Sequence, residues 1–234
     1  MGLQAKNMSE SEQATCVGTA AQRPWDARLA CWLVTPLKNS GATPNQLTTL
    51  RLLIGLGAAA AFIPGTYGWS NLGALLLILS NFADHMDGEL ARISGKFSPI
   101  GHLYDLVSDA AVTILLFIAI GVGIGSRHDG ALRVSPVVLG TVSGTAIALI
   151  FFLRMRIEEL AGKAATQQAS LAGFETEDVL YLLPLVTLGN RVVPFLVVAS
   201  ICAPLFALWV VVDYRRALGR RQWTTCRPST EAAQ

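Results

Sequence analysis

Long apolar runs, separated by short polar segments, make up most of the sequence between residues 44 and 217. A helix needs about 20 predominantly apolar residues to cross the hydrocarbon core of a bilayer. Prolines mark the start of several runs, where the first turn of a helix tolerates them. The pattern therefore predicts six membrane-spanning helices, of which the fifth is short for a full crossing. Their expected bounds are residues 44–64, 69–94, 99–125, 135–160, 177–190 and 192–217.

The segment that precedes the first run is apolar on one side only. In residues 24–38, Trp25, Leu29 and Trp32 share one side of a helix, and the charged residues lie off it. The segment is too short to span a bilayer, and tryptophans with basic neighbours suit the headgroup level. We expect an interfacial helix that lies flat on the membrane, rather than the core helix of a soluble protein. The predicted fold class is thus an all-α integral membrane protein, with six transmembrane helices preceded by an N-terminal amphipathic interfacial helix.

The composition supports this assignment. Hydrophobic residues make up 52% of the 234 residues and charged residues only 15%, whereas soluble domains have about 25% charged residues. The net charge of +2 gives no reason to expect a nucleic-acid partner. The four cysteines are scattered and form neither a zinc motif nor a disulfide framework. We predict a single membrane domain over residues 23–221, flanked by disordered tails at residues 1–22 and 222–234.

Basic residues predict the orientation of the spans. All but three of the 18 lysines and arginines fall on the side that holds both chain ends and the loops after the second and fourth spans. The three on the other side are Arg127, Arg133 and Arg191. Because cytoplasmic loops are enriched in Lys and Arg, we expect both termini to be cytoplasmic, in a bacterial inner (plasma) membrane.

Four aspartates lie at the junction of the second and third predicted spans: Asp84, Asp87, Asp105 and Asp109. Residues three or four apart share one face of a helix, so each span carries two of them on one face, and a tight turn would bring the faces together. Carboxylates this close repel one another, and divalent cations relieve the repulsion. Ligand sets made only of oxygen favour magnesium, manganese or calcium over zinc. Four carboxylates are enough for a two-metal centre, which suits displacement at phosphorus.

The residues around these aspartates resemble the signature of the CDP-alcohol phosphatidyltransferase family at all eight of its fixed positions. The match is Asp84-x2-Asp87-Gly88-x2-Ala91-Arg92-x8-Gly101-x3-Asp105-x3-Asp109. The resemblance extends to Pro44-Asn45-x2-Thr48-x2-Arg51 and to the six-span plan, and it covers roughly residues 24 to 217.

The resemblance implies a membrane enzyme of phospholipid biosynthesis. Such an enzyme transfers a substituted phosphate from a CDP-linked donor to an alcohol, with release of CMP. It also implies two divalent cations, Mg²⁺ or Mn²⁺, with Asp84, Asp87 and Asp105 as ligands and Asp109 near them. Asp109 would be the general base. The implied nucleotide-binding residues are Gly88, Ala91, Arg92, Gly101, Asn45 and Thr48. Arg154 and Arg156 would contact a substrate phosphate, and relatives of this family form homodimers.

Several alternatives stay open at this level. Asn45, Thr48 and Arg51 could line the nucleotide site or brace the aspartate helices, or they could act as a helix cap and a positive-inside anchor. Arg154 and Arg156 could also be anchors. His85 and His102 fall at variable positions of the motif and are interpreted as neighbours of the site. Three acids before the fifth span, Glu175, Glu177 and Asp178, could bind a cationic acceptor or cap a helix.

The substrates also stay open. We favour CDP-diacylglycerol as donor and a small polar alcohol as acceptor, and the alternative is transfer from CDP-choline or CDP-ethanolamine to diacylglycerol. A divalent-cation carrier is the alternative from another functional class. It would need acids deep in the membrane, whereas these lie at the ends of their spans.

Overall fold

The computed structural model describes residues 32–35, 43–94, 99–127, 133–161 and 182–225. The predicted tail at residues 1–22 lies outside the described residues, as do residues 226–234. So does the predicted interfacial helix, apart from one helical turn at residues 32–35. Glu175, Glu177 and Asp178 also lie outside them.

All regular elements in the described segments are helices, which confirms the all-α prediction. The first four helices begin and end within two residues of the predicted spans. They are α3 (Pro44–Phe62), α4 (Tyr67–Ser94), α5 (Pro99–Gly125) and α6 (Pro136–Ala161). Two more helices follow, α9 (Leu183–Leu188) and α10 (Val192–Thr225). Each of α3, α5 and α6 begins with a proline, which explains why the sequence predicted the first residues of these helices closely.

The last two helices differ from their predicted bounds. Within the described part of the fifth predicted span, α9 has only six residues, because Gly189 and Asn190 end it and Asn190 has a φ of 52°. The last span was predicted to end at residue 217, and the apolar segment of α10 that is long enough to cross a membrane ends at Gly219. The helix itself continues beyond this segment to Thr225, because the arginine-rich sequence consists largely of good helix formers.

Three of the described helices are long and apolar enough to cross a membrane. These segments are Ile100–Gly125, Pro136–Ile157 and Val192–Gly219. α4 has 28 residues, but its second half carries Asp84, His85, Asp87, Glu89 and Arg92. The expectation of six spans therefore stays a prediction for the remaining helices.

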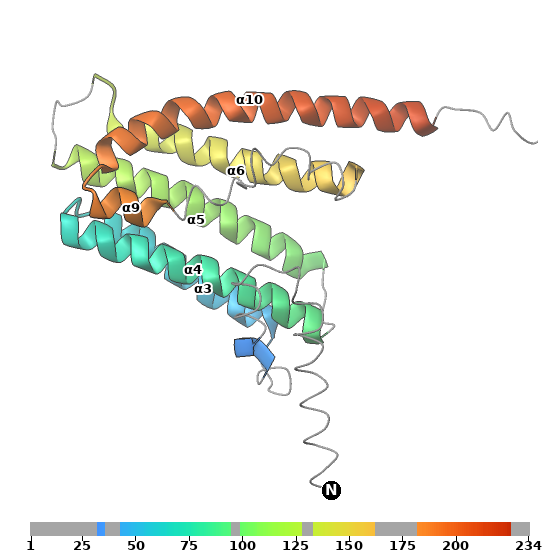
Figure 1. The fold of residues 1–234 in the computed structure, drawn as a ribbon, viewed down its shortest axis with the longest axis horizontal. Helices are drawn as coiled ribbons and strands as arrows, with labels where there is room; N and C mark the ends of the chain where they lie inside the picture. Colours follow the sequence, from blue (N-terminus) through green and yellow to red (C-terminus); the bar gives the residue numbers. More distant parts are fainter. Residues whose placement is uncertain (1–31, 36–42, 95–98, 128–132, 162–181, 226–234) are drawn as a thin grey trace, which may run out of the picture.

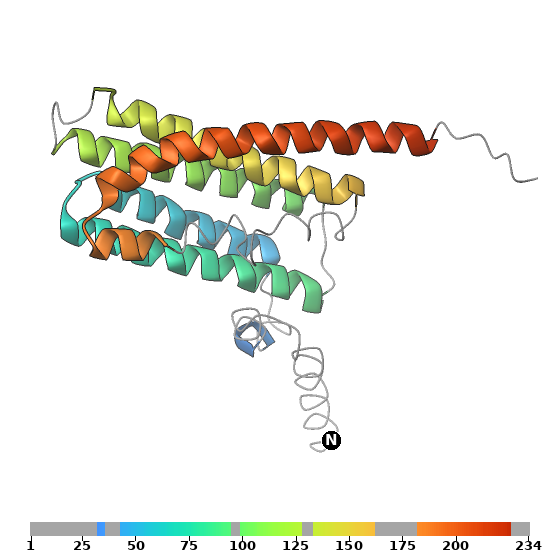
Figure 2. The ribbon, with the colours of Figure 1, turned by 45° about the horizontal axis from the view of Figure 1, so that its top comes forward.

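The helices run back and forth as a bundle (Figures 1 and 2). α3 packs against α4 and α5, α6 lies between α5 and α10, and α9 contacts α4. The end of α4, the start of α5 and the end of α6 therefore lie at one end of the bundle (Figure 1). Buried apolar side chains of α3, α4 and α5, including Phe62, Leu77 and Leu116, form the main core. This core fixes the three helices that carry the aspartates and their partners.

Candidate functional site

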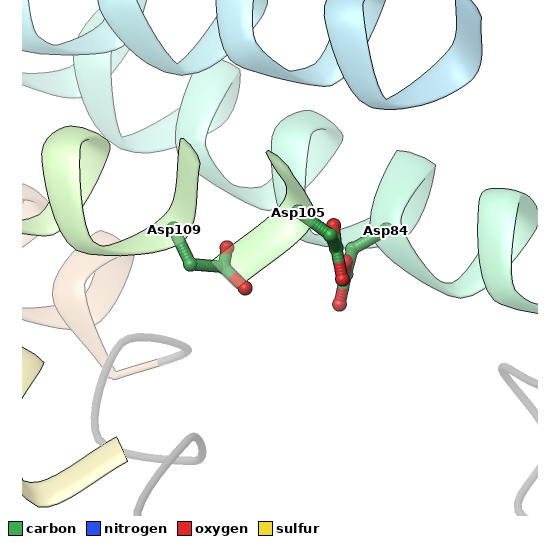
Figure 3. Close-up of side chains that lie close together, drawn as sticks. All are labelled: Asp84, Asp105 and Asp109. Atoms are coloured by element: carbon green, nitrogen blue, oxygen red, sulfur yellow. The ribbon is translucent and has the colours of Figure 1, made fainter. Parts of the chain in front are cut away.

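Three of the four aspartates converge between α4 and α5. One carboxylate oxygen from each of Asp84, Asp105 and Asp109 can be chosen so that all three lie within 4.8 Å of one another. Asp84 comes from α4, and Asp105 and Asp109 lie one turn apart on α5, pointing to the same side (Figure 3). The three side chains are about one third to one half exposed. Oxygen ligands of this kind suit a hard divalent cation such as Mg²⁺ or Mn²⁺.

Arg51 of α3 joins these three carboxylates. One nitrogen of its guanidinium, Nη1, pairs with Asp84 and lies 2.8 Å from Asp109 Oδ1. The other, Nη2, lies 2.8 Å from Asp105 Oδ1 and also donates to the backbone oxygen of Asp105 at 3.2 Å. Only 3% of Arg51 is exposed. A buried side chain paired with three carboxylates does not have the exposed position that a membrane-surface anchor requires.

The fourth aspartate has a separate partner. Asp87 is buried, and its Oδ2 accepts a hydrogen bond of 2.8 Å from the hydroxyl of Thr48, which is also buried. Thr48 lies one turn before Arg51, so a single face of α3 contacts all four aspartates. The hydroxyl of Ser80 on α4 donates to the backbone oxygen of Arg51 at 3.0 Å and links α4 to this turn.

A cavity of about 470 Å³ adjoins the three carboxylates. Its polar wall includes Arg51, His85 and His102, and its apolar wall extends along α5 and α6. Leu103 and Val107 on α5 and Phe152 on α6 line this cavity and are exposed. The cavity thus has a charged end and an exposed apolar wall. The remaining lining residues are Leu77, Ser80, Asn81, Leu106, Ala110, Val112, Thr113, Leu116, Ala148, Phe151 and Met155.

Five other motif residues are not among the residues that line this cavity: Gly88, Ala91, Arg92, Gly101 and Asn45. Gly88 is exposed, and a Cβ added there would meet no atom within 4 Å, so it leaves room for a ligand. Arg92 is exposed and pairs with buried Glu89 at 2.9 Å. Ala91 and Gly101 are partly buried, and Asn45 is exposed at the start of α3, where its backbone oxygen accepts a hydrogen bond from Thr49.

Two arginines near the end of α6 are the sequence neighbours of a residue that lines the cavity. Met155 lines the cavity wall, and its neighbours Arg154 and Arg156 are partly buried and exposed, respectively.

The structure thus brings Asp84, Asp105 and Asp109 together and pairs Asp87 with Thr48. The sequence offered bracing of the aspartate helices by Thr48 and Arg51 as one alternative, on the basis of their three-residue spacing and the family pattern. It did not indicate which aspartates each residue contacts, or that Ser80 bonds to the backbone of Arg51.

Comparison with known proteins gives three findings. The family model described as CDP-alcohol phosphatidyltransferase matches residues 42–212. The chain is 37% identical over 78 residues to the CDP-diacylglycerol–glycerol-3-phosphate 3-phosphatidyltransferase of Cereibacter sphaeroides, which is 33% of this chain and 35% of that protein. It is 38% identical over 87 residues to the archaetidylinositol phosphate synthase of Pyrococcus horikoshii, covering 36% and 45% of the two chains. The matched stretch thus spans less than half the length of each of these curated relatives.

The fold is similar to that of the phosphatidylinositol phosphate synthase of Mycobacterium tuberculosis. Its crystal structure with CDP-DAG bound gives a TM-score of 0.54 at 20% identity, over 88% of this chain and 98% of that one. A second structure of the same enzyme, in complex with manganese and citrate, gives a TM-score of 0.54 at 18% identity over 88% and 93%. At these identities the likeness concerns the fold alone.

Proposed function

The chain belongs to the CDP-alcohol phosphatidyltransferase family, and from this we propose that it transfers a phosphatidyl group from CDP-diacylglycerol to a small alcohol, with release of CMP. It would do so as an integral membrane enzyme of phospholipid biosynthesis, with its site and both termini on the cytoplasmic side. The observation that carries this proposal is the position of the three carboxylates. They lie at the charged end of a cavity whose other wall is apolar and reaches the exposed surface of α5 and α6. A lipid pyrophosphate needs both environments at once.

We assign the metal to the aspartates. Asp84, Asp105 and Asp109 would hold a divalent cation, and Asp87, held by Thr48, would complete a two-cation site. A divalent cation held by these aspartates, Mg²⁺ or Mn²⁺, would supply positive charge against the pyrophosphate and the leaving CMP. The manganese in the structure of the Mycobacterium tuberculosis enzyme supports this assignment.

The proton acceptor in this proposal is Asp109. It is the most exposed of the three carboxylates, at 48%, against 37% for Asp84 and 34% for Asp105. A general base must reach the proton that it accepts. As the acceptor oxygen forms its bond to phosphorus and the bond from phosphorus to CMP breaks, Asp109 would take the hydroxyl proton. The open space at Gly88 and the exposed guanidinium of Arg92 would accommodate the cytidine nucleotide, together with Asn45, Thr48, Ala91 and Gly101.

The acceptor in this proposal carries a phosphate. The matched relatives from Cereibacter sphaeroides and Pyrococcus horikoshii are named for a glycerol phosphate and an inositol phosphate. Arg154 and Arg156, at the end of α6 beside the cavity residue Met155, would supply the positive charge for this group. Arginine suits such a role because its planar fork of donors matches phosphate oxygens.

The direct test is CMP release by the purified protein in detergent. We expect release with CDP-diacylglycerol, Mg²⁺ or Mn²⁺ and either glycerol 3-phosphate or an inositol phosphate, and none after EDTA. Asp109→Asn should lower the rate by about 10²- to 10⁴-fold, because it removes the base. Asp105→Asn should also lower it and should raise the metal concentration needed. Asp213→Asn on α10, outside the lining of the cavity, is the matched control.

Two results would contradict the proposal. One is unchanged CMP release in the Asp109→Asn variant. The other is release only with CDP-choline or CDP-ethanolamine and diacylglycerol, which would reverse the assignment of donor and acceptor. Thin-layer analysis of the lipid product separates these two directions of transfer. Manganese uptake by proteoliposomes without any nucleotide, together with an absence of CMP release, would instead indicate a cation carrier.

A further inference from the structure

Arg51 contacts the carboxylate oxygens to which we assign the metal. It belongs to α3, which is outside the aspartate motif of α4 and α5. Its guanidinium contacts Asp84 and Asp109 through one nitrogen and Asp105 through the other. The residue is 3% exposed, and its backbone oxygen is fixed by the hydroxyl of Ser80. These contacts with α4 and α5 hold the Arg51 side chain in one position, unlike an arginine side chain on the protein surface.

Burial of this arginine is costly unless carboxylates compensate for it. An ionised side chain taken out of water needs opposite charges and hydrogen bonds close by. The converse also holds, since three carboxylates within 4.8 Å of one another repel unless a positive charge lies among them. Arg51 and the aspartates therefore hold one another in place, and the guanidinium ties Asp84 on α4 to Asp105 and Asp109 on α5.

A guanidinium and a divalent cation draw on the same oxygen atoms. Arginine has only N–H donors and stays charged at all accessible pH values. Each contact between Arg51 and a carboxylate therefore lowers the negative potential that attracts a cation. Three carboxylates and one guanidinium leave two negative charges, which is the charge that one divalent cation balances.

We propose that Arg51 is the positioning residue that sets how tightly this site holds its metal, by keeping the three carboxylates together while lowering their affinity for a divalent cation. The inference rests on the proposed function only in that these carboxylates bind the cation. It assigns Arg51 neither an anchoring role nor a contact with the nucleotide.

The test measures Mn²⁺ binding and thermal stability rather than turnover. Wild type, Arg51→Gln and Arg51→Lys are purified in detergent and titrated with MnCl₂ by calorimetry, and their unfolding is followed with EDTA and with Mn²⁺. Arg51→Gln should unfold at a lower temperature in EDTA, because the carboxylates repel. It should also bind Mn²⁺ about tenfold more tightly and gain more stability from Mn²⁺ than the wild type does, because a nearby positive charge has been removed. Arg127→Gln, two residues after the end of α5 and hydrogen-bonded to the backbone oxygen of Pro64, is the matched control.

Arg51→Lys keeps the positive charge but loses the planar set of N–H donors of the guanidinium. It therefore provides a second test should Arg51→Gln fail to fold. It should bind Mn²⁺ within about twofold of the wild type, although it unfolds at a lower temperature in EDTA. Weaker or unchanged Mn²⁺ binding in Arg51→Gln, or a large loss of binding in Arg51→Lys, would overturn the inference. A wild-type protein that binds Mn²⁺ but releases no CMP would refute the proposed function and leave this inference intact.

Discussion

Thr48 shows how one hydroxyl group positions a buried carboxylate of the candidate site. Its oxygen lies 2.8 Å from Asp87 Oδ2 and 3.2 Å from the backbone oxygen of Pro44, and the residue is buried. A buried carboxylate without a hydrogen-bond donor is strongly unfavourable. Thr48 therefore orients the Asp87 side chain, which has a partner on α3 different from that of the three carboxylates that converge on Arg51.

Thr48→Val tests this pair. The substitution preserves the shape of the side chain and leaves the buried carboxyl oxygen of Asp87 without its hydrogen-bond donor, so the free energy of unfolding should fall by about 1–3 kcal/mol. Thermal or denaturant unfolding in detergent measures the loss. Thr48→Ser should recover most of it. The neighbouring Thr49→Val should cost less, because Thr49 is exposed and hydrogen-bonds to Asn45 and Tyr104 at the surface. Equal losses at positions 48 and 49 would show that the contact with Asp87 contributes little.

The residues of the site were predictable to different degrees. The spacing of the aspartates predicted which of them share a helix face, and Asp84, Asp105 and Asp109 do converge. The partners of Arg51 and Asp87 were not predictable, because they depend on how α3 is rotated and shifted against α4 and α5. Packing of Phe62, Leu77 and Leu116 sets that register, and no local motif encodes it.

At the scale of elements, glycines on α6 set its distance from α5. Gly140 and Gly144 are four residues apart and share one face of α6. A Cβ added at Gly144 would lie 2.9 Å from Ile114 Cα and 3.1 Å from Phe117 Cβ, and one added at Gly140 would meet the backbone oxygen of Phe117. Small residues in this spacing let helix backbones approach closely in membranes. This contact holds α6 close to α5, and both helices contribute side chains to the wall of the cavity.

Gly140→Ala should force these two helices apart. Overpacking of a tight contact costs about 1–3 kcal/mol, and the obstacle here is backbone, which cannot rotate away as a side chain can. Thermal unfolding in detergent should show the loss, and CMP release should fall with it, because both helices contribute residues to the cavity. Gly68→Ala on α4 is the control, because a Cβ there meets no atom within 4 Å. This control should be neutral or slightly stabilising, since alanine is the better helix former. A neutral Gly140→Ala would mean that α5 and α6 are not held by this contact.

At the scale of the whole molecule, the apolar exterior agrees with a lipid environment. α10 presents a row of exposed side chains at alternating three- and four-residue spacing: Val198, Ile201, Leu205, Leu208 and Val212. The hydrophobic pattern predicted α3 to α6 closely, because each begins at or near a proline or an interfacial aromatic residue. It could not predict the extent of α9 and α10, whose ends depend on a positive φ at Asn190 and on a polar but helix-forming sequence.

The orientation is testable by cysteine labelling. Cys16, Cys31, Cys202 and Cys226 are replaced by serine, and single cysteines are introduced as Ser126→Cys and Gly219→Cys, both at exposed positions. If the basic end of the bundle is cytoplasmic, an impermeant maleimide added to intact spheroplasts should label only the Ser126→Cys variant. The Gly219→Cys variant should become labelled after permeabilisation. The reverse pattern would place the carboxylates outside the cell.

The length of α10 has a practical consequence for work with this protein. Its 34 residues extend about 50 Å at 1.5 Å per residue, against a hydrocarbon core of about 30 Å. The helix continues well past the end of α6 (Figures 1 and 2). A fluorescent reporter or an affinity tag fused after α10 would lie away from the cavity. Immobilisation through the C-terminus should therefore leave turnover unimpeded.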